Sequence, residues 1–95
     1  MPATLRKEKV YIKVTSDFDA TGYMQPRFIT WSDGRIFRID QVTDFRPAGA
    51  IGSPHNCDCY TIRVNGKARH LFFERTDPLF RSLVGRWFVE RSTEL

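Results

Sequence analysis

Two short segments of the chain carry the pattern of a β-hairpin, and they constrain its fold more than any other feature. The first is ITWSDGRIFRI at residues 29–39, and the second is YTIRVNGKARHLFF at residues 60–73. Each segment places an Asp-Gly or Asn-Gly pair between runs rich in β-branched and aromatic residues. That arrangement is the strongest short-range signal for two antiparallel strands joined by a tight turn. The sequence therefore predicts an all-β domain.

The second hairpin predicts which side chains share a face of the sheet. A two-residue turn at Asn65-Gly66 joins a strand at Cys57–Val64 to a strand at Lys67–Arg75, and alternate residues of a strand point to opposite faces. The predicted core face carries Tyr60, Ile62, Val64, Leu71 and Phe73, with Lys67 and Arg69 near its tip. The opposite face carries Cys57, Cys59, Thr61, Arg63, Ala68, His70, Phe72 and Glu74.

The first hairpin predicts a bent sheet. A two-residue turn at Asp33-Gly34 pairs Thr30 with Phe37, and large apolar side chains then lie on both faces of the hairpin. A flat sheet usually leaves one face polar, so we expect strong bending or a covered far side. The strand after the turn, residues 35–45, is long enough to bend and to serve two sheets of a barrel.

Two more strands and one helical turn complete the predicted fold. Residues 9–15 alternate apolar with polar side chains, and residues 86–91 form a closing strand. Between the hairpins and that last strand, Asp77 is a plausible helix cap with Pro78 at the first helical position. The expected fold is a small, partly open SH3-like barrel of five or six antiparallel strands with one short helical turn; an OB-like barrel is the alternative. Its predicted core contains Val10, Ile12, Val14, Ile62, Val64, Leu71 and Phe73, together with Trp31 and Trp87.

Length and charge set the broad class of the protein. A chain of 95 residues corresponds to one domain, which we place at residues 9–91, between flexible ends at residues 1–8 and 92–95. The net charge of +4 permits binding to an acidic partner without requiring it. No apolar run is long enough to span a membrane, and the first ten residues lack the apolar region of a secretory signal. A cytoplasmic location is therefore expected.

One cluster has the residue types of a metal site. On the strand after His55, Cys57 and Cys59 point to the same face, with His70 diagonally across from Cys59. These four side chains could converge on a zinc ion, but structural zinc sites use C-x₂₋₄-C spacing, which is wider than C-x-C. A nucleophilic cysteine would also need an orienting acid and an oxyanion pocket, and no motif marks either. We therefore expect no metal, no cofactor and no enzyme activity.

The second hairpin also carries a basic cluster. Its candidate nucleic-acid contacts are Tyr60, Arg63, Lys67, Arg69 and His70. Basic groups interleaved with aromatic rings on a small barrel are typical of surfaces that bind single strands. Four charges make only a small footprint, however, so a solvated hairpin tip is the favoured explanation. The pattern therefore indicates nucleic-acid binding as a second choice.

The segments FITWSDGRIFRIDQV (residues 28–42) and RWFVE (residues 86–90) resemble small bacterial proteins of uncharacterised function that have an SH3-like β-barrel. The resemblance extends over residues 9–91 and rests on hairpin and core features. It implies a fold and carries over no site residue.

The expected function is that of a small non-catalytic interaction module. A small barrel leaves edge strands with unpaired N–H and C=O groups, and one short closing strand is too small to cover the whole face that carries Cys57, Cys59 and Phe72. We expect a protein partner or a second copy to dock on such a face or edge. The alternatives are weak, sequence-tolerant nucleic-acid binding and, more remotely, a small zinc-binding protein.

Overall fold

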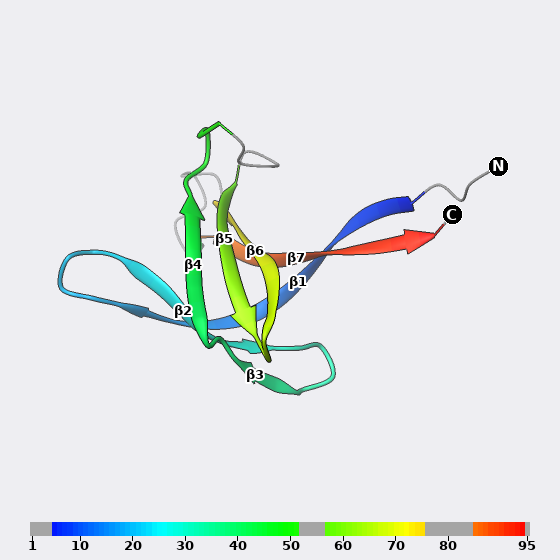
Figure 1. The fold of residues 1–95 in the computed structure, drawn as a ribbon, viewed down its shortest axis with the longest axis horizontal. Helices are drawn as coiled ribbons and strands as arrows, with labels where there is room; N and C mark the ends of the chain where they lie inside the picture. The colour runs from blue at the N-terminus through cyan, green and yellow to red at the C-terminus, as the bar shows by residue number, and fades with distance from the viewer. Residues whose placement is uncertain (1–4, 52–56, 76–84, 95) are drawn as a thin grey trace.

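The computed structural model describes residues 5–51, 57–75 and 85–94, and these form one antiparallel sheet of seven strands with no helix (Figure 1). The order across the sheet is β3-β2-β1-β7-β6-β5-β4. The strands are β1 (Leu5–Phe18), β2 (Met24–Thr30), β3 (Ile36–Arg38), β4 (Gln41–Arg46), β5 (Asp58–Val64), β6 (Lys67–Arg75) and β7 (Gly85–Glu94). The all-β prediction is confirmed, but the predicted number of five or six strands is wrong. The helical turn predicted at residues 76–84 lies outside the described residues.

The sheet curls because β1 changes partner midway. Residues 5–12 of β1 pair with β7, and residues 13–18 pair with β2 on the other edge of the strand. The two halves of the sheet are thereby turned against each other into a half-barrel (Figure 1). β1 and β7 extend beyond the predicted domain bounds, since Leu5 pairs with Glu94.

The extra strand arises from a break in the predicted strand at residues 35–45. β3 and β4 follow each other in the chain but lie at opposite ends of the sheet. At the junction the N–H of Ile39 donates to the carbonyl of Arg27, and the N–H of Asp40 donates to the carbonyl of Arg63, each at 2.8 Å. The backbone thus passes from one end of the sheet to the other within two residues. The expected bending is confirmed, and it divides the segment into two strands.

The register of the first hairpin differs from the prediction by one residue. Thr30 pairs with Ile36, not with Phe37. The N–H of Trp31 donates to the carbonyl of Arg35, so the loop between them has three residues, at positions 32–34. Only Gly34 has a positive φ, of 89°, and its N–H donates to the carbonyl of Trp31, which fits a type I turn followed by a bulge. A slip of one residue moves every side chain to the other face. Ile29, Phe37 and Ile39 therefore share the inner face, and Phe28 and Ile36 are left exposed on the outer face.

The second hairpin follows its predicted register. Val64 pairs with Lys67 across a two-residue turn, in which Asn65 and Gly66 have φ values of 52° and 76°. Both positive φ angles are what a type I′ turn requires. The two faces predicted from this register are confirmed.

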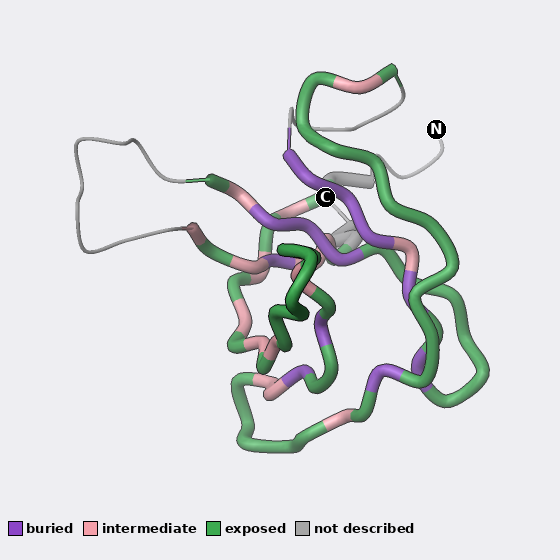
Figure 2. Tube along the Cα trace, turned by 90° about the vertical axis from the view of Figure 1, so that its left-hand side faces the viewer, coloured by how far each residue is buried: buried purple, intermediate pink, exposed green. Residues whose placement is uncertain are grey.

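The main core lies on the concave side of the half-barrel, and its most buried residues come from β5 and β6 (Figure 2). Ile62 and Leu71 have no exposed surface, and Val64 and Phe73 are buried beside them. The predicted Ile12, Val14, Trp31 and Trp87 are partly buried and pack against this cluster, whereas Val10 is partly buried without being part of it. The core prediction is thus largely confirmed.

A second, smaller apolar cluster lies on the other face. It contains Cys57, Cys59, Phe72 and Phe88, all buried, with the last two rings stacked at 4.9 Å. Tyr11 packs edge-on against Phe88 at 5.8 Å. The expectation of an incompletely covered Cys57/Cys59 face is therefore wrong, since both cysteines are buried. Tyr11 of β1, which was not predicted to lie on this face, packs on Phe88.

Candidate functional site

Of the described residues of the cysteine and histidine cluster, Cys57 and Cys59 are buried, whereas His70 is exposed. The Sγ of Cys59 lies 3.9 Å from Nδ1 of His70, and the hydroxyl of Thr61 lies 3.4 Å from the same nitrogen. Burial raises the pKa of both Cys57 and Cys59 above the ordinary thiol value, which disfavours the nucleophilic thiolate. His55 lies outside the described residues, and within them no three His, Cys, Asp or Glu side chains converge.

The absence of a metal stays a prediction, and elemental analysis of the purified protein tests it. A content of about one zinc per chain, lost on substitution of Cys59 by Ser or of His70 by Ala, would contradict it.

The predicted nucleic-acid residues do not share one surface. Arg63 and His70 point to the outer face of the sheet, whereas Lys67 and Arg69 belong to the rows of the inner face. Tyr60 is buried in the main core and is 7% exposed, so its ring cannot stack on a base. Along the described chain, no carboxylate forms an ion pair with Arg63, Lys67, Arg69 or His70. The hairpin is basic but offers no continuous aromatic platform.

Strand β4 is an open edge that the sequence did not single out. All six of its residues are exposed, and β5 is its one hydrogen-bonded neighbour in the sheet. Val42 pairs with Ile62 and Phe45 pairs with Tyr60, so both apolar side chains point to the concave face. They remain 36% and 44% exposed because no strand follows β4 in the sheet. The sequence did not indicate this edge, because it predicted one continuous strand at residues 35–45 where the structure has β3 and β4.

An irregularity in β4 sets the spacing of these two apolar residues. The register shifts between Val42 and Asp44, so that Thr43 has no partner of its own on β5. The hydroxyl of Thr43 donates to the carbonyl of Thr61 at 3.3 Å. Because the bulge adds one residue, Val42 and Phe45 share a face although they are three positions apart.

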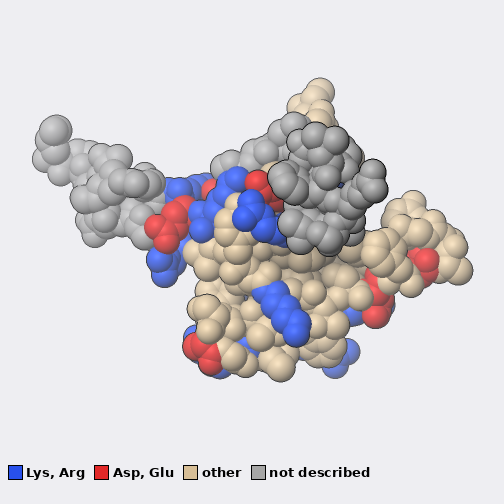
Figure 3. Space-filling view, turned by 180° about the vertical axis from the view of Figure 1, so that it is seen from behind, with Lys and Arg blue, Asp and Glu red and all other residues tan. Residues whose placement is uncertain are grey.

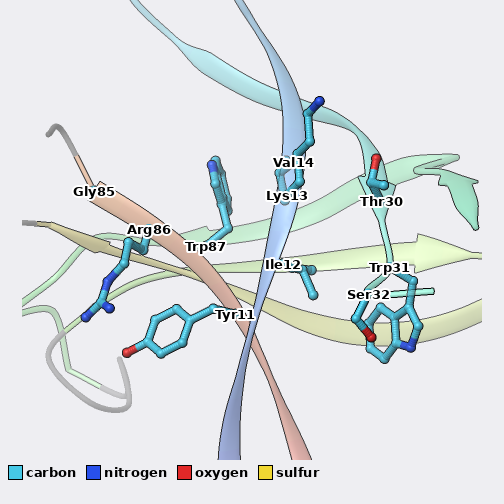
Figure 4. Close-up of a pocket in the computed structure, with 10 residues that line it drawn as sticks. All are labelled: Tyr11, Ile12, Lys13, Val14, Thr30, Trp31, Ser32, Gly85, Arg86 and Trp87. Carbon is cyan, nitrogen blue, oxygen red and sulfur yellow. The ribbon is translucent and has the colours of Figure 1, made fainter. Parts of the chain in front are cut away.

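An open cavity of about 530 Å³ lies where β1 changes partner (Figure 4). It is lined by residues of β1, by the end of β2 and the turn after it, and by the start of β7. Both tryptophans of the chain, Trp31 and Trp87, line it, as do Lys13 and Arg86. Sequence reading assigned both tryptophans to the core, and they do pack against it, but each is only partly buried. The cavity was missed because its residues come from three separate segments.

Comparisons with known proteins identify no relative: no family model, no curated protein and no solved structure matches the chain. Among the described residues there is no helix with the length and apolar character needed to cross a membrane.

Proposed function

We propose that this chain is a small non-catalytic interaction module of the SH3-like class that self-associates through the open edge of β4. The observation that supports this proposal is the exposure of all six β4 residues, with Val42 and Phe45 uncovered on the concave face. A free strand edge presents unpaired N–H and C=O groups that another strand can satisfy. The raised pKa of the buried thiols fits a non-catalytic role.

The sequence of β4 complements itself. In an antiparallel pair centred between Thr43 and Asp44, Val42 of each copy lies opposite Phe45 of the other. Both side chains belong to the concave face, so the pair would place two apolar contacts on one side of the joint sheet. A two-fold interface needs a patch of this kind, in which each residue meets a residue of the same patch. A second copy of the chain is therefore the partner that β4 fits best.

The association should be weak and dependent on concentration. Two six-residue strands bury much less than the roughly 1,200–2,000 Å² of a standard stable interface. Each apolar cross-strand pair contributes only about 0.2–1 kcal/mol beyond the backbone hydrogen bonds. We expect a monomer–dimer equilibrium with a dissociation constant on the order of 10–1,000 µM, as small interfaces give.

Sedimentation equilibrium over a range of protein concentrations tests the proposal. The average mass should rise from the monomer mass of 11.1 kDa toward twice that value. Substitution of Val42 and Phe45 by Lys should restore the monomer, because charged edge residues prevent strand addition. Ile36→Lys is the matched control, since Ile36 is 66% exposed on β3, the strand at the other end of the sheet. A monomer at millimolar concentration, or equal loss in the control, would refute dimerisation through β4.

A further inference from the structure

The first part of β6 has a neighbouring strand on one side only. β5 pairs with β6 over residues 67–73, whereas β7 pairs with β6 only from Phe72 onward. Beyond Phe88, the partner of Phe72, β7 continues beside β1 and runs away from β6 (Figure 1). Within the described part of the chain, residues 67–71 therefore form a free strand edge.

The turn before β6 decides which backbone groups point to this edge. In a hydrogen-bonded β-turn the N–H of the fourth residue points back to the first, which directs the backbone of Lys67 toward Val64 of β5. Hydrogen-bonded and non-hydrogen-bonded pairs then alternate along an antiparallel ladder. The N–H and C=O groups of Ala68 and His70 therefore point away from β5, as do those of Phe72, where the pairing with β7 begins. At Ala68 and His70, no strand of the described chain pairs with these groups.

The side chains at this edge are exposed, and two of them are cations on one face. The first four residues of β6 are exposed. Arg69 pairs with Ile62, which has no exposed surface, so the main core covers β5 here but leaves the neighbouring residue of β6 open. Lys67 and Arg69 alternate with Ala68 and share a face, about 7 Å apart along the strand. Neither cation forms an ion pair with a carboxylate of the described residues.

We propose that the free edge of β6 binds an extended acidic segment of a partner protein, which adds to the sheet as a further antiparallel strand. The backbone of the segment pairs with Ala68 and His70, as in other proteins that recognise peptides by strand addition. Side chains of the added strand alternate with the same period as those of β6. Acidic residues two positions apart therefore lie beside Lys67 and Arg69. The residue between them lies beside the small side chain of Ala68 and can be large.

The charge and the backbone of this edge favour an acidic peptide over two other partners. A second copy that paired through the same edge would bring Lys67 and Arg69 of both chains together, and like charges on neighbouring strands are destabilising. A nucleic-acid strand would satisfy the cations, but it has no peptide groups for Ala68 and His70, and Tyr60 of the hairpin is buried. Grooves that bind nucleic acid follow the strand with continuous positive charge, whereas the face seen in Figure 3 carries cations scattered among acidic and uncharged side chains.

This proposal is independent of dimerisation through β4. The two edges lie on opposite sides of β5 in the sheet, since the strand order there is β6-β5-β4. They also differ in chemistry, because β4 presents Val42 and Phe45 where β6 presents two cations. Each edge can therefore be occupied or disrupted without the other.

Titration with a synthetic peptide, followed by NMR of the ¹⁵N-labelled protein, tests the proposal. The probe is a short peptide that alternates Glu with Thr, because Thr favours extended structure and keeps the peptide soluble. At low salt it should shift the amide signals of Ala68 and His70 saturably, with a dissociation constant on the order of 10–1,000 µM, as a small contact gives. The affinity should fall as salt is added, because salt screens exposed charges.

Three control peptides separate backbone pairing from charge. A peptide with Lys in place of Glu should bind at least about tenfold more weakly, because its charges repel those of the edge. In an antiparallel pair the residue opposite Ala68 donates its N–H to β6, and in the probe that residue is Thr. N-methylation of the Thr residues should therefore weaken binding about tenfold or more. N-methylation of the Glu residues, whose N–H groups point away from β6, should change the affinity less than about threefold.

Two variants of the protein connect the binding to this edge. Lys67→Glu/Arg69→Glu should weaken peptide binding about tenfold or more at low salt. Ala68→Pro removes one edge N–H at a position where an edge strand tolerates proline, and it should weaken binding about tenfold. Arg63→Glu is the matched control, since Arg63 lies on the same hairpin but on β5 and on the other face, and it should lower the affinity less than about threefold. A urea unfolding curve for each variant confirms that it is folded.

Four results would overturn the proposal. The first is no saturable shift with the acidic peptide at low salt, and the second is full affinity in Lys67→Glu/Arg69→Glu. The third is full affinity of both N-methylated peptides, which would show that charge alone is recognised. The fourth is tighter binding of oligothymidylate than of the peptide with the same two cations required, which would assign the edge to nucleic acid. Loss of dimerisation in Val42→Lys/Phe45→Lys with unchanged peptide binding would separate this proposal from the one for β4.

Discussion

Gly85 opens β7 at a point where the chain has no room for a side chain. A Cβ atom added there would lie 2.5 Å from Cζ and 2.9 Å from Cε2 of Phe73, and 2.7 Å from the carbonyl oxygen of Glu74. Phe73 is only 6% exposed and packs against Trp87 at 4.9 Å. Its ring therefore cannot move aside without disturbing the core, and the Glu74 oxygen belongs to the backbone of β6.

The expected cost of Gly85→Ala follows from two opposing contributions. Overpacking of a well-filled site typically costs about 1–3 kcal/mol, and the backbone contact places this site in the upper part of that range. Replacing Gly by Ala also reduces the entropy of the unfolded chain, which stabilises by about 0.4–1 kcal/mol. The net loss in the free energy of unfolding should be about 1–2 kcal/mol.

Urea denaturation followed by tryptophan fluorescence measures this loss. With a denaturant slope of about 1–2 kcal/mol per molar, the midpoint should fall by about 1 M. Phe73→Leu removes the ring atoms that the new methyl group would meet, so Gly85→Ala should cost less in that background, by about 1 kcal/mol. A midpoint that stays the same or rises in Gly85→Ala would refute the argument from close packing.

Three further predictions concern single side chains. The hydrogen bond from Tyr11 holds the pKa of Glu74 below its ordinary value of 4.5. The ionised carboxylate therefore stabilises the fold above that pH, and this stabilisation is lost as pH falls through the folded pKa. In Glu74→Gln, the free energy of unfolding should depend less on pH on the acid side. Asp58 has a side chain that is 4% exposed and accepts hydrogen bonds from a backbone N–H and an arginine, so Asp58→Ala should lower the unfolding free energy by about 2 kcal/mol in a urea titration. Burial raises the pKa of the Cys57 and Cys59 thiols. In the native protein a disulfide reagent should therefore modify them at least about tenfold more slowly than free cysteine, and urea unfolding should remove this protection. Rapid modification of the native protein would contradict this.

The two hairpins show how far sequence alone specifies register. Asn65 and Gly66 both adopt positive φ, as a two-residue type I′ turn requires, and the register was predicted correctly. Asp33-Gly34 satisfies the same sequence pattern, but only Gly34 has positive φ, because a three-residue turn places just one residue there. The pattern of residues is compatible with both loops. The three-residue loop is the one that places Phe37 opposite Ile29, where both pack with the main core formed by distant strands.

The candidate sites were beyond sequence reading for a related reason. The hairpin signals identify local pairs, whereas the cavity exists only because β1 pairs with β7 along its first part and with β2 along its second. Nothing local to Trp31 indicates that Trp87 lines the same cavity. The edge at β4 likewise depends on the two-residue passage at Ile39 and Asp40, which has no Gly or Pro to mark it. The inner faces and the pairing of β5 and β6 could be predicted, but the inner face of β3 and the long-range neighbours of β1 and β4 could not.

The long-range pairing of β1 also has a consequence for biosynthesis. Residues 5–12 are made well before their partners at residues 87–94. At roughly 5–20 residues per second, this half of β1 waits several seconds without a partner. A circular permutant that joins Leu5 to Glu94 through a short linker and opens the chain at Asp33-Gly34 would turn this pairing into a local hairpin. Because folding rates rise as contacts become more local, the permutant should fold faster while keeping the same sheet.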